Sequence, residues 1–202
     1  MKITPALWFV SALAANVSAS SLVRRQAPNG VAKVNLATRT GKATFLGSGF
    51  IYGWPNNGVE ADSTIPEYLA KDIKFNANRA GGAQTPSRGW AYGGYKPYLP
   101  RFQSTLSNYR TTRKYGGEFI LLVHDLWGAD GSTKNTTLHP GDNGSWTEME
   151  TFLKQLCDDI KANNMTEGLV MDIWNEPELN IFWSRSWSQY LEYYVRATRF
   201  IR

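Results

Sequence analysis

The stretch "EFILLVHD", residues 118 to 125, decides how the rest of the chain is interpreted. It is an almost continuous apolar run, which is typical of a strand buried on both faces of a parallel sheet. The stretch "EGLVMDIW", residues 167 to 174, has the same character. We therefore predict that both stretches are strands of one parallel sheet.

Between these two strands, residues 145 to 164 predict an amphipathic helix. Ser145 and Glu148 have the spacing of a capping box, in which each side chain bonds to the backbone of the other residue. Cys157, the only cysteine, lies beside the apolar stripe and is expected to be inert packing. The stripe has helical spacing and consists of Met149, Phe152, Leu153, Leu156 and Ile160.

The same alternation continues toward the N-terminus. Residues 45 to 53 and 73 to 81 predict two further strands, and each is followed by a predicted helix. The first helix covers about residues 65 to 73, with Thr64 and Glu67 in capping-box spacing. The second runs from about Tyr98 to Tyr115 and places Leu99, Phe102, Leu106 and Tyr109 on one face.

After the fourth strand, Ser186 and Gln189 predict the start of a last helix, which carries Leu191, Tyr194 and Val195. Four successive strand-helix units imply a parallel sheet with right-handed crossovers, as in a doubly wound sheet or a (β/α)8 barrel. The loops after the strands are long, the loops after the helices are short, and no glycine-rich phosphate fingerprint opens a helix. We therefore predict an α/β fold, the N-terminal half (about four βα units) of a (β/α)8 TIM barrel.

The N-terminus has the features of a secretory signal. A lysine precedes a short apolar run and then small residues, which predicts a signal peptide at residues 1 to 19. The apolar run is well short of the ~20 residues of a membrane-spanning helix. The pair Arg24-Arg25 suggests a propeptide at residues 20 to 25, which leaves residues 26 to 202 as the folded domain.

The charge of the chain depends on this processing. The whole chain has a formal charge of +5, but its first 25 residues hold three of the 22 basic residues and none of the 17 acidic ones, so removing them leaves +2. No basic run remains, so neither nucleic acid nor a membrane surface is expected as a partner. Sequons at Asn135, Asn143 and Asn164 fit a secreted, extracellular glycoprotein.

The fourth predicted strand runs into "WNEPE", which places Asn175 and Glu176 where barrel enzymes keep catalytic groups. The stretch "DIWNEPE" resembles the (β/α)8 glycoside hydrolases whose fourth strand ends in Asn-Glu, and it is most similar to glycoside hydrolase family 39, the β-xylosidases and α-L-iduronidases. The resemblance covers about residues 45 to 202 and is specific at residues 172 to 178. It implies that residues 26 to 202 are part of a catalytic domain that hydrolyses O-glycosyl bonds with retention.

In the resemblance, Glu176 is the general acid/base and Asn175 binds the sugar hydroxyl next to the anomeric carbon. The substrate is expected to be plant cell-wall or similar carbohydrate, and neither a cofactor nor a metal is implied. A glycosidic oxygen leaves readily only when it is protonated, so a carboxylic acid must lie within hydrogen-bond reach. The plain alternative is that Glu176 is a favourable acid near a helix N-terminus.

Two further polar residues end predicted strands. Arg79 follows the second strand and matches an arginine that supports the catalytic carboxylates in these families, whereas a salt bridge at the barrel rim is the alternative. His124, which ends the third strand with Asp125, is a candidate sugar ligand or a buried structural histidine. A metal site built from His124, Asp125, Asp130 and His139 has no recognised ligand spacing and is not expected.

Tryptophans follow the predicted strands and would gather on the same rim. Sugars present apolar C–H faces that stack on aromatic rings. We therefore expect Trp127 and Trp183 to contact the substrate, although tryptophan is more often a core residue. The complete set consists of Trp54, Trp90, Trp127 and Trp183.

A retaining glycosidase also needs a nucleophilic carboxylate ~5 Å from the acid/base. In the family this glutamate follows the seventh strand, so it is expected beyond Arg202. Glu178, Asp125 and Asp172 lie near the motif in sequence, but none matches the position of the nucleophile. The competing hypothesis is a noncatalytic carbohydrate-binding pseudoenzyme or an inactive truncated fragment.

Overall fold

The computed structural model describes residues 30, 31, 33–35, 37, 38, 41, 48–55, 65–130 and 137–202. The chain divides into two units, Met1–Lys42 and Ala43–Arg202, and the second holds the helices and strands described below. The predicted signal peptide, the predicted propeptide, Thr64 and Asn135 lie outside the described residues.

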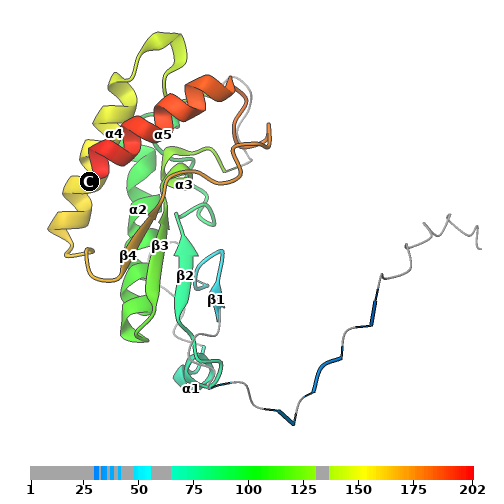
Figure 1. Cartoon of the computed structure of the whole chain (residues 1–202). Helices are drawn as coiled ribbons and strands as arrows, with labels where there is room; N and C mark the ends of the chain where they lie inside the picture. Colours follow the sequence, from blue (N-terminus) through cyan, green and yellow to red (C-terminus); the bar gives the residue numbers. More distant parts are fainter. Residues whose placement is uncertain are drawn as a thin grey trace, which may run out of the picture. The chain divides into compact units, whose positions relative to one another are not determined.

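Four short strands form one sheet. They are β1 (Gly49–Phe50), β2 (Ala77–Ala80), β3 (Glu118–Leu122) and β4 (Leu169–Asp172), and they lie side by side in chain order (Figure 1). All three pairings are parallel, so the carboxyl ends of the strands meet at one edge. This confirms the predicted α/β class and the predicted order of the strands.

The third strand ends at Leu122, three residues earlier than predicted. Val123–Trp127 form a short helix, α3, which ends at Gly128 in the left-handed conformation with φ of 103°. The N–H groups of Gly128 and Ala129 both donate to the carbonyl of His124, at 2.9 and 3.1 Å. His124 and Asp125 therefore lie on a helical turn that directly follows β3.

The remaining helices follow the strands in turn, and α2 runs along β3 in Figure 1. All five residues of the apolar stripe predicted for residues 145 to 164 are buried, which confirms that stripe. None of the described helices is both long enough and apolar enough to cross a membrane. The elements are α1 (Glu67–Asp72), the short 3-10 helix η1 (Trp90–Tyr92), α2 (Tyr95–Lys114), the 3-10 helix η2 (Asp142–Gly144), α4 (Thr147–Ala162) and α5 (Trp187–Ile201).

Helix α2 packs on the sheet through polar groups that its apolar pattern did not predict. Asn108 Oδ1 accepts hydrogen bonds from the Trp54 N–H at 2.6 Å and from Asn78 Nδ2 at 3.3 Å. Thr112 Oγ1 accepts from Trp54 Nε1 at 3.2 Å and from Asn78 Nδ2 at 3.0 Å. Because these buried donors and acceptors pair with one another, polar residues replace part of the expected apolar stripe. The buried residues of α2 are Tyr98, Arg101, Phe102, Ser104, Thr105, Asn108, Tyr109 and Thr112.

Two of the three predicted capping residues, Thr64 and Ser145, are not the N-caps of their helices. Trp146 is the N-cap of α4, and Glu148 Oε1 accepts a hydrogen bond from Trp90 Nε1 at 2.6 Å. The N-cap of α1 is Pro66, which has no side chain that can accept a cap hydrogen bond. At α5 the prediction is confirmed, because Ser186 Oγ accepts from the Gln189 N–H at 3.3 Å.

The apolar residues predicted for α5 do not lie on the buried face of the helix. Leu191, Tyr194 and Val195 are all between 45 and 48% exposed. The helix instead buries Tyr190, Tyr193 and Ala197 against the core.

The two faces of the sheet differ in how they are covered. Phe119 and Leu121 of β3 are fully buried, and the Tyr109 ring of α2 lies 5.8 Å from the Phe119 ring. On the opposite face, Ile120 is half-buried, and Val170, its partner on β4, is 43% exposed. Among the described residues, helices therefore cover one face of the sheet and leave the other largely open.

Candidate active site

A cavity of about 210 Å³ lies at the carboxyl ends of the strands. Residues that end or follow each of the four strands contribute to it, so the parallel sheet brings together side chains that are far apart in sequence. Four predicted site residues, Arg79, His124, Asn175 and Glu176, meet in this cavity. Its lining consists of Ile51, Tyr52, Arg79, Ala83, Leu122, His124, Asp125, Asp130, Asn175, Glu176 and Phe182.

A chain of hydrogen bonds runs along the mouth of this cavity. Arg79 Nε donates to Asp172 Oδ2 at 2.8 Å, and Arg79 Nη2 donates to Asn175 Oδ1 at 2.8 Å. Asn175 Nδ2 in turn donates to Glu176 Oε2 at 2.8 Å. Because Arg79 holds the amide oxygen, the amide nitrogen of Asn175 faces Glu176 and its second N–H is available for a ligand.

The backbone of Glu176 is left-handed, with φ of 42°. This conformation is costly for a residue with a side chain, on the order of 1 kcal/mol or more, and such strain is found most often at functional sites. The side chain of Glu176 is exposed and lies between Asn175 and Pro177. The loop therefore holds a carboxylate at the mouth of the cavity in a conformation that the sequence alone would not favour.

A second acidic group lies deeper in the same cavity. Asp125 is only 7% exposed, and its backbone carbonyl accepts a hydrogen bond from Arg101 Nη1. The same guanidinium donates from Nη2 to Asp130 Oδ2 at 2.6 Å and from Nε to the carbonyl of Ser87 at 2.7 Å. Arg101, which is buried in α2, therefore fixes the turn that carries Asp125 and the loop that carries Asp130.

The pKa values of Asp125 and of the neighbouring His124 are both shifted. Burial and then the negative charge of Asp130 raise the pKa of Asp125 to about 7. Burial and then the positive charge of Arg79 lower the pKa of His124 to about 3. At neutral pH the His124 ring is therefore uncharged, and the carboxyl group of Asp125 keeps its proton to a higher pH than an ordinary aspartic acid does.

The four tryptophans expected at the site are buried, and none of them lines the cavity. Trp127 is 1% exposed, and its Nε1 donates to the carbonyl of Leu138 at 2.9 Å. Trp183 is 2% exposed and stacks on Tyr193 with ring centroids 5.9 Å apart. The other two predicted rim tryptophans, Trp54 and Trp90, are also buried. Each indole N–H finds an acceptor inside the protein, so the loops after the strands fold over these rings.

Two aromatic residues that were not predicted as site residues, Tyr52 and Phe182, also line the cavity. Tyr52, which follows β1, is 82% exposed and is the aromatic residue of the lining that most resembles a stacking platform. Phe182 lies with its ring 5.7 Å from the ring of His124. Both residues follow a strand, which could have marked them as candidates. The buried tryptophans also follow strands, so position in the sequence alone does not separate the two groups.

The four residues considered as a possible metal site do not come together in one cluster. His124, Asp125 and Asp130 line the cavity, whereas the ring of His139 packs 5.2 Å from the ring of Trp183. His139 Nδ1 contacts the carbonyl of Thr137 at 3.0 Å, and burial lowers the pKa of His139. In the part of the chain that the structure describes, no group of three or more His, Cys, Asp and Glu residues is placed to hold a metal ion.

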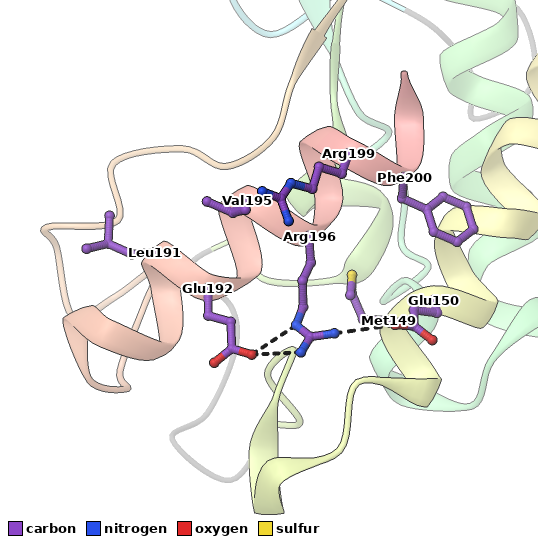
Figure 2. Close-up of a pocket in the computed structure, with 8 residues that line it drawn as sticks. All are labelled: Met149, Glu150, Leu191, Glu192, Val195, Arg196, Arg199 and Phe200. Carbon is purple, nitrogen blue, oxygen red and sulfur yellow. Dashed lines mark hydrogen bonds and ion pairs between the residues drawn. The ribbon is translucent and has the colours of Figure 1, made fainter.

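A larger cavity, of about 740 Å³, lies between α4 and α5 (Figure 2). Three of its charged side chains pair with one another, because Arg196 contacts Glu192 at 2.8 Å and Glu150 at 3.8 Å. The remaining lining is partly apolar and includes Leu191 and Val195. Every residue of this lining belongs to α4 or α5 and none ends or follows a strand, so the smaller cavity is the better candidate for chemistry.

Comparisons of the chain with protein-family models, with curated proteins and with solved structures found no significant match. The two sequons inside the described region, at Asn143 and Asn164, have exposed asparagines.

Proposed function

We propose that this chain is the N-terminal half of a secreted (β/α)8 barrel glycoside hydrolase that resembles glycoside hydrolase family 39. The observation that carries the proposal is the hydrogen-bonded series Arg79, Asn175 and Glu176 at the carboxyl ends of β2 and β4. The series lies in a cavity to which every described strand contributes, which is where barrel enzymes keep their catalytic groups. Glu176 is the general acid/base in this proposal.

The arrangement suits proton transfer to a glycosidic oxygen. Glu176 receives the Asn175 amide on Oε2, which leaves Oε1 for the leaving group. The second N–H of the Asn175 amide can donate to the sugar hydroxyl beside the anomeric carbon. Arg79 fixes the orientation of this amide, so its role in the proposal is positioning.

The distribution of helices supports a barrel rather than a doubly wound sheet. In a doubly wound fold helices cover both faces of the sheet, whereas a barrel carries its helices only on the outside. Phe119 and Leu121 are buried beneath helices, while Val170 on the opposite face is 43% exposed. The open face corresponds to the interior of the proposed barrel.

The nucleophile of a retaining reaction is expected beyond Arg202, so residues 26 to 202 alone are predicted not to hydrolyse glycosides. In a protein form that includes the nucleophile, Glu176→Gln should lose most hydrolysis of unactivated glycosides, by about 10²- to 10⁴-fold. Aryl glycosides whose leaving group needs no proton should restore much of the rate. Equal rates for the variant and the parent on an unactivated substrate would contradict the acid/base role.

The rival hypothesis of a noncatalytic carbohydrate-binding module loses support from the burial of the tryptophans. Such modules hold sugars mainly on exposed aromatic rings. Trp127 and Trp183 are in the core, and Tyr52 is the exposed aromatic residue in the cavity lining. The polar series at Glu176 is more typical of a catalytic site.

A further inference from the structure

Asp125 has no role in the mechanism proposed above, yet its carboxyl group lies in the same cavity as Glu176. It comes from α3, whereas Glu176 comes from the loop after β4. Asp125 is 7% exposed, while Glu176 is at the surface. The cavity therefore has one acid at its mouth and another at its inner wall.

The fold makes specific room for the Asp125 side chain. A Cβ atom on Gly81 would lie 2.4 Å from Asp125 Cβ, 2.4 Å from the Leu122 carbonyl oxygen and 3.0 Å from Asp125 Oδ2. The φ of Gly81 is outside the left-handed range, so glycine is needed here for space and not for its backbone conformation. Together with the hydrogen bond from Arg101 to the Asp125 carbonyl, this close packing fixes the carboxyl group against the cavity wall.

His124 beside it has unused hydrogen-bonding capacity. Both ring nitrogens are buried and have no hydrogen-bond partner among the described residues. Nδ1 lies 3.2 Å from Asp125 Oδ1, but without the geometry of a hydrogen bond. Buried polar atoms in native proteins almost always have a partner, so an unpartnered imidazole that lines a cavity indicates a place for a ligand hydroxyl.

We propose that Asp125 and His124 form a second ligand-binding pair, which holds hydroxyl groups of the sugar ring whose glycosidic oxygen faces Glu176. This inference rests on the proposed function and adds two contacts to it. Protonated Asp125 donates a hydrogen bond to one hydroxyl, and the uncharged His124 ring exchanges a hydrogen bond with another. Both groups are neutral when they bind, which suits a buried site and a neutral ligand.

Ligand binding then depends on pH through Asp125. The charged groups that face it are Asp130 from the following loop, Arg101 from α2, Arg79 from β2 and Asp172 from β4. Burial and the charge of Asp130 prevail over the two arginines, so the pKa of Asp125 rises to about 7. Above this pH the carboxylate can only accept hydrogen bonds, so the hydrogen bond that its O–H group donated to the ligand is lost, and the bound ligand would bury a negative charge.

The test measures dissociation constants of the full chain at pH 5.5 and 8.5 by ligand-observed NMR. The probes are methyl β-D-xylopyranoside, methyl α-L-arabinofuranoside and methyl β-D-glucuronide. For at least one probe, the parent should bind about tenfold more weakly at pH 8.5, which corresponds to the loss of one hydrogen bond to a neutral donor. Asp125→Asn keeps a neutral donor, so it should bind equally at both pH values. Asp158→Asn, at an exposed acid of α4, should behave like the parent.

The outcomes separate the two proposals. Binding by the parent with equal affinity at both pH values, or a pH effect that survives in Asp125→Asn, overturns the role of Asp125 and leaves Glu176 untouched. Absence of binding for all three probes at both pH values overturns the sugar site itself and this inference with it. If Asp125→Asn does not fold, the ¹³C signal of the Asp125 carboxyl group in the parent decides. Its titration near pH 7 should move toward higher pH when a probe binds, and no movement would contradict the proposal.

Discussion

The two carboxylic acids of the cavity have opposite surroundings. Glu176 is exposed, sits on a left-handed backbone and accepts a hydrogen bond from Asn175. Asp125 is buried on a regular helical turn, next to an uncharged imidazole and another acid. The comparison shows that the surroundings of a carboxyl group decide its properties, because one side chain is open to a ligand while the other retains its proton to a higher pH.

The largest expected effect concerns the packing beneath both acids. Trp183 and Trp174 have ring centroids 5.1 Å apart, and Trp174 lies 5.5 Å from the His124 ring. Trp183→Ala should lower the free energy of unfolding by about 3–5 kcal/mol, as expected for removing a buried aromatic side chain. Trp187→Ala, at a residue that is 53% exposed, is the control and should cost far less. Thermal or denaturant melts measure both, and similar losses for the two variants would show that Trp183 is not a core residue.

A smaller effect should separate the acids by their pH dependence. The pKa of Asp125 is raised in the folded state, so ionising it costs stability as pH rises from about 4 to about 7. Asp125→Asn removes this cost, and its gain in unfolding free energy should grow over that range to on the order of 3 kcal/mol. Denaturant melts at pH 4, 5.5 and 8 measure it, with Asp158→Asn as control. A gain that does not change with pH would mean that Asp125 ionises normally.

His124 should produce the opposite slope. Its pKa is lowered in the folded state, so the protein loses stability as pH falls from about 6.5 toward 3, where the unfolded chain takes up a proton and the folded chain does not. In the parent this slope and that of Asp125 oppose each other between about pH 4 and 6.5. In Asp125→Asn the stability should therefore rise clearly with pH over this interval. A flat profile in that variant would contradict the buried, uncharged state of His124.

The smallest effect concerns the strained backbone at Glu176. Glu176→Gly should raise the free energy of unfolding by up to about 1 kcal/mol, because glycine adopts a left-handed φ without steric cost. Glu176→Gln keeps the strain and should leave stability unchanged, so it is the matched control. If the glycine variant is less stable than the glutamine variant in denaturant melts, the backbone at this position is not strained.

The sequence predicted those features that depend on periodicity. The stripe from Met149 to Ile160 and the order of the parallel strands follow from repeating apolar patterns, and both are confirmed. The contact between Arg79 and Asn175 could be predicted from the sequence because the carboxyl ends of parallel strands lie at one edge of the sheet. These features are local or follow directly from topology.

The remaining features depend on tertiary contacts that leave no periodic signal. The polar groups of Asn108 and Thr112 are buried because Asn78 on β2 and Trp54 donate hydrogen bonds to them. Trp127 is in the core because the carbonyl of Leu138 receives its N–H. Position after a strand could not distinguish this buried ring from the exposed Tyr52.

The most direct test of the central claim is an NMR titration of the chain with methyl β-D-xylopyranoside. Site-specific shifts identify which cavity the sugar enters, in the parent and in Glu176→Gln. The account predicts that the side-chain amide signals of Asn175 and the Nε–H signal of Arg79 shift on addition of the sugar, because both groups border the cavity at the strand ends. Shifts confined to the methyl groups of Leu191 and Val195 would place the ligand between α4 and α5 and contradict the account, as would no shift at all.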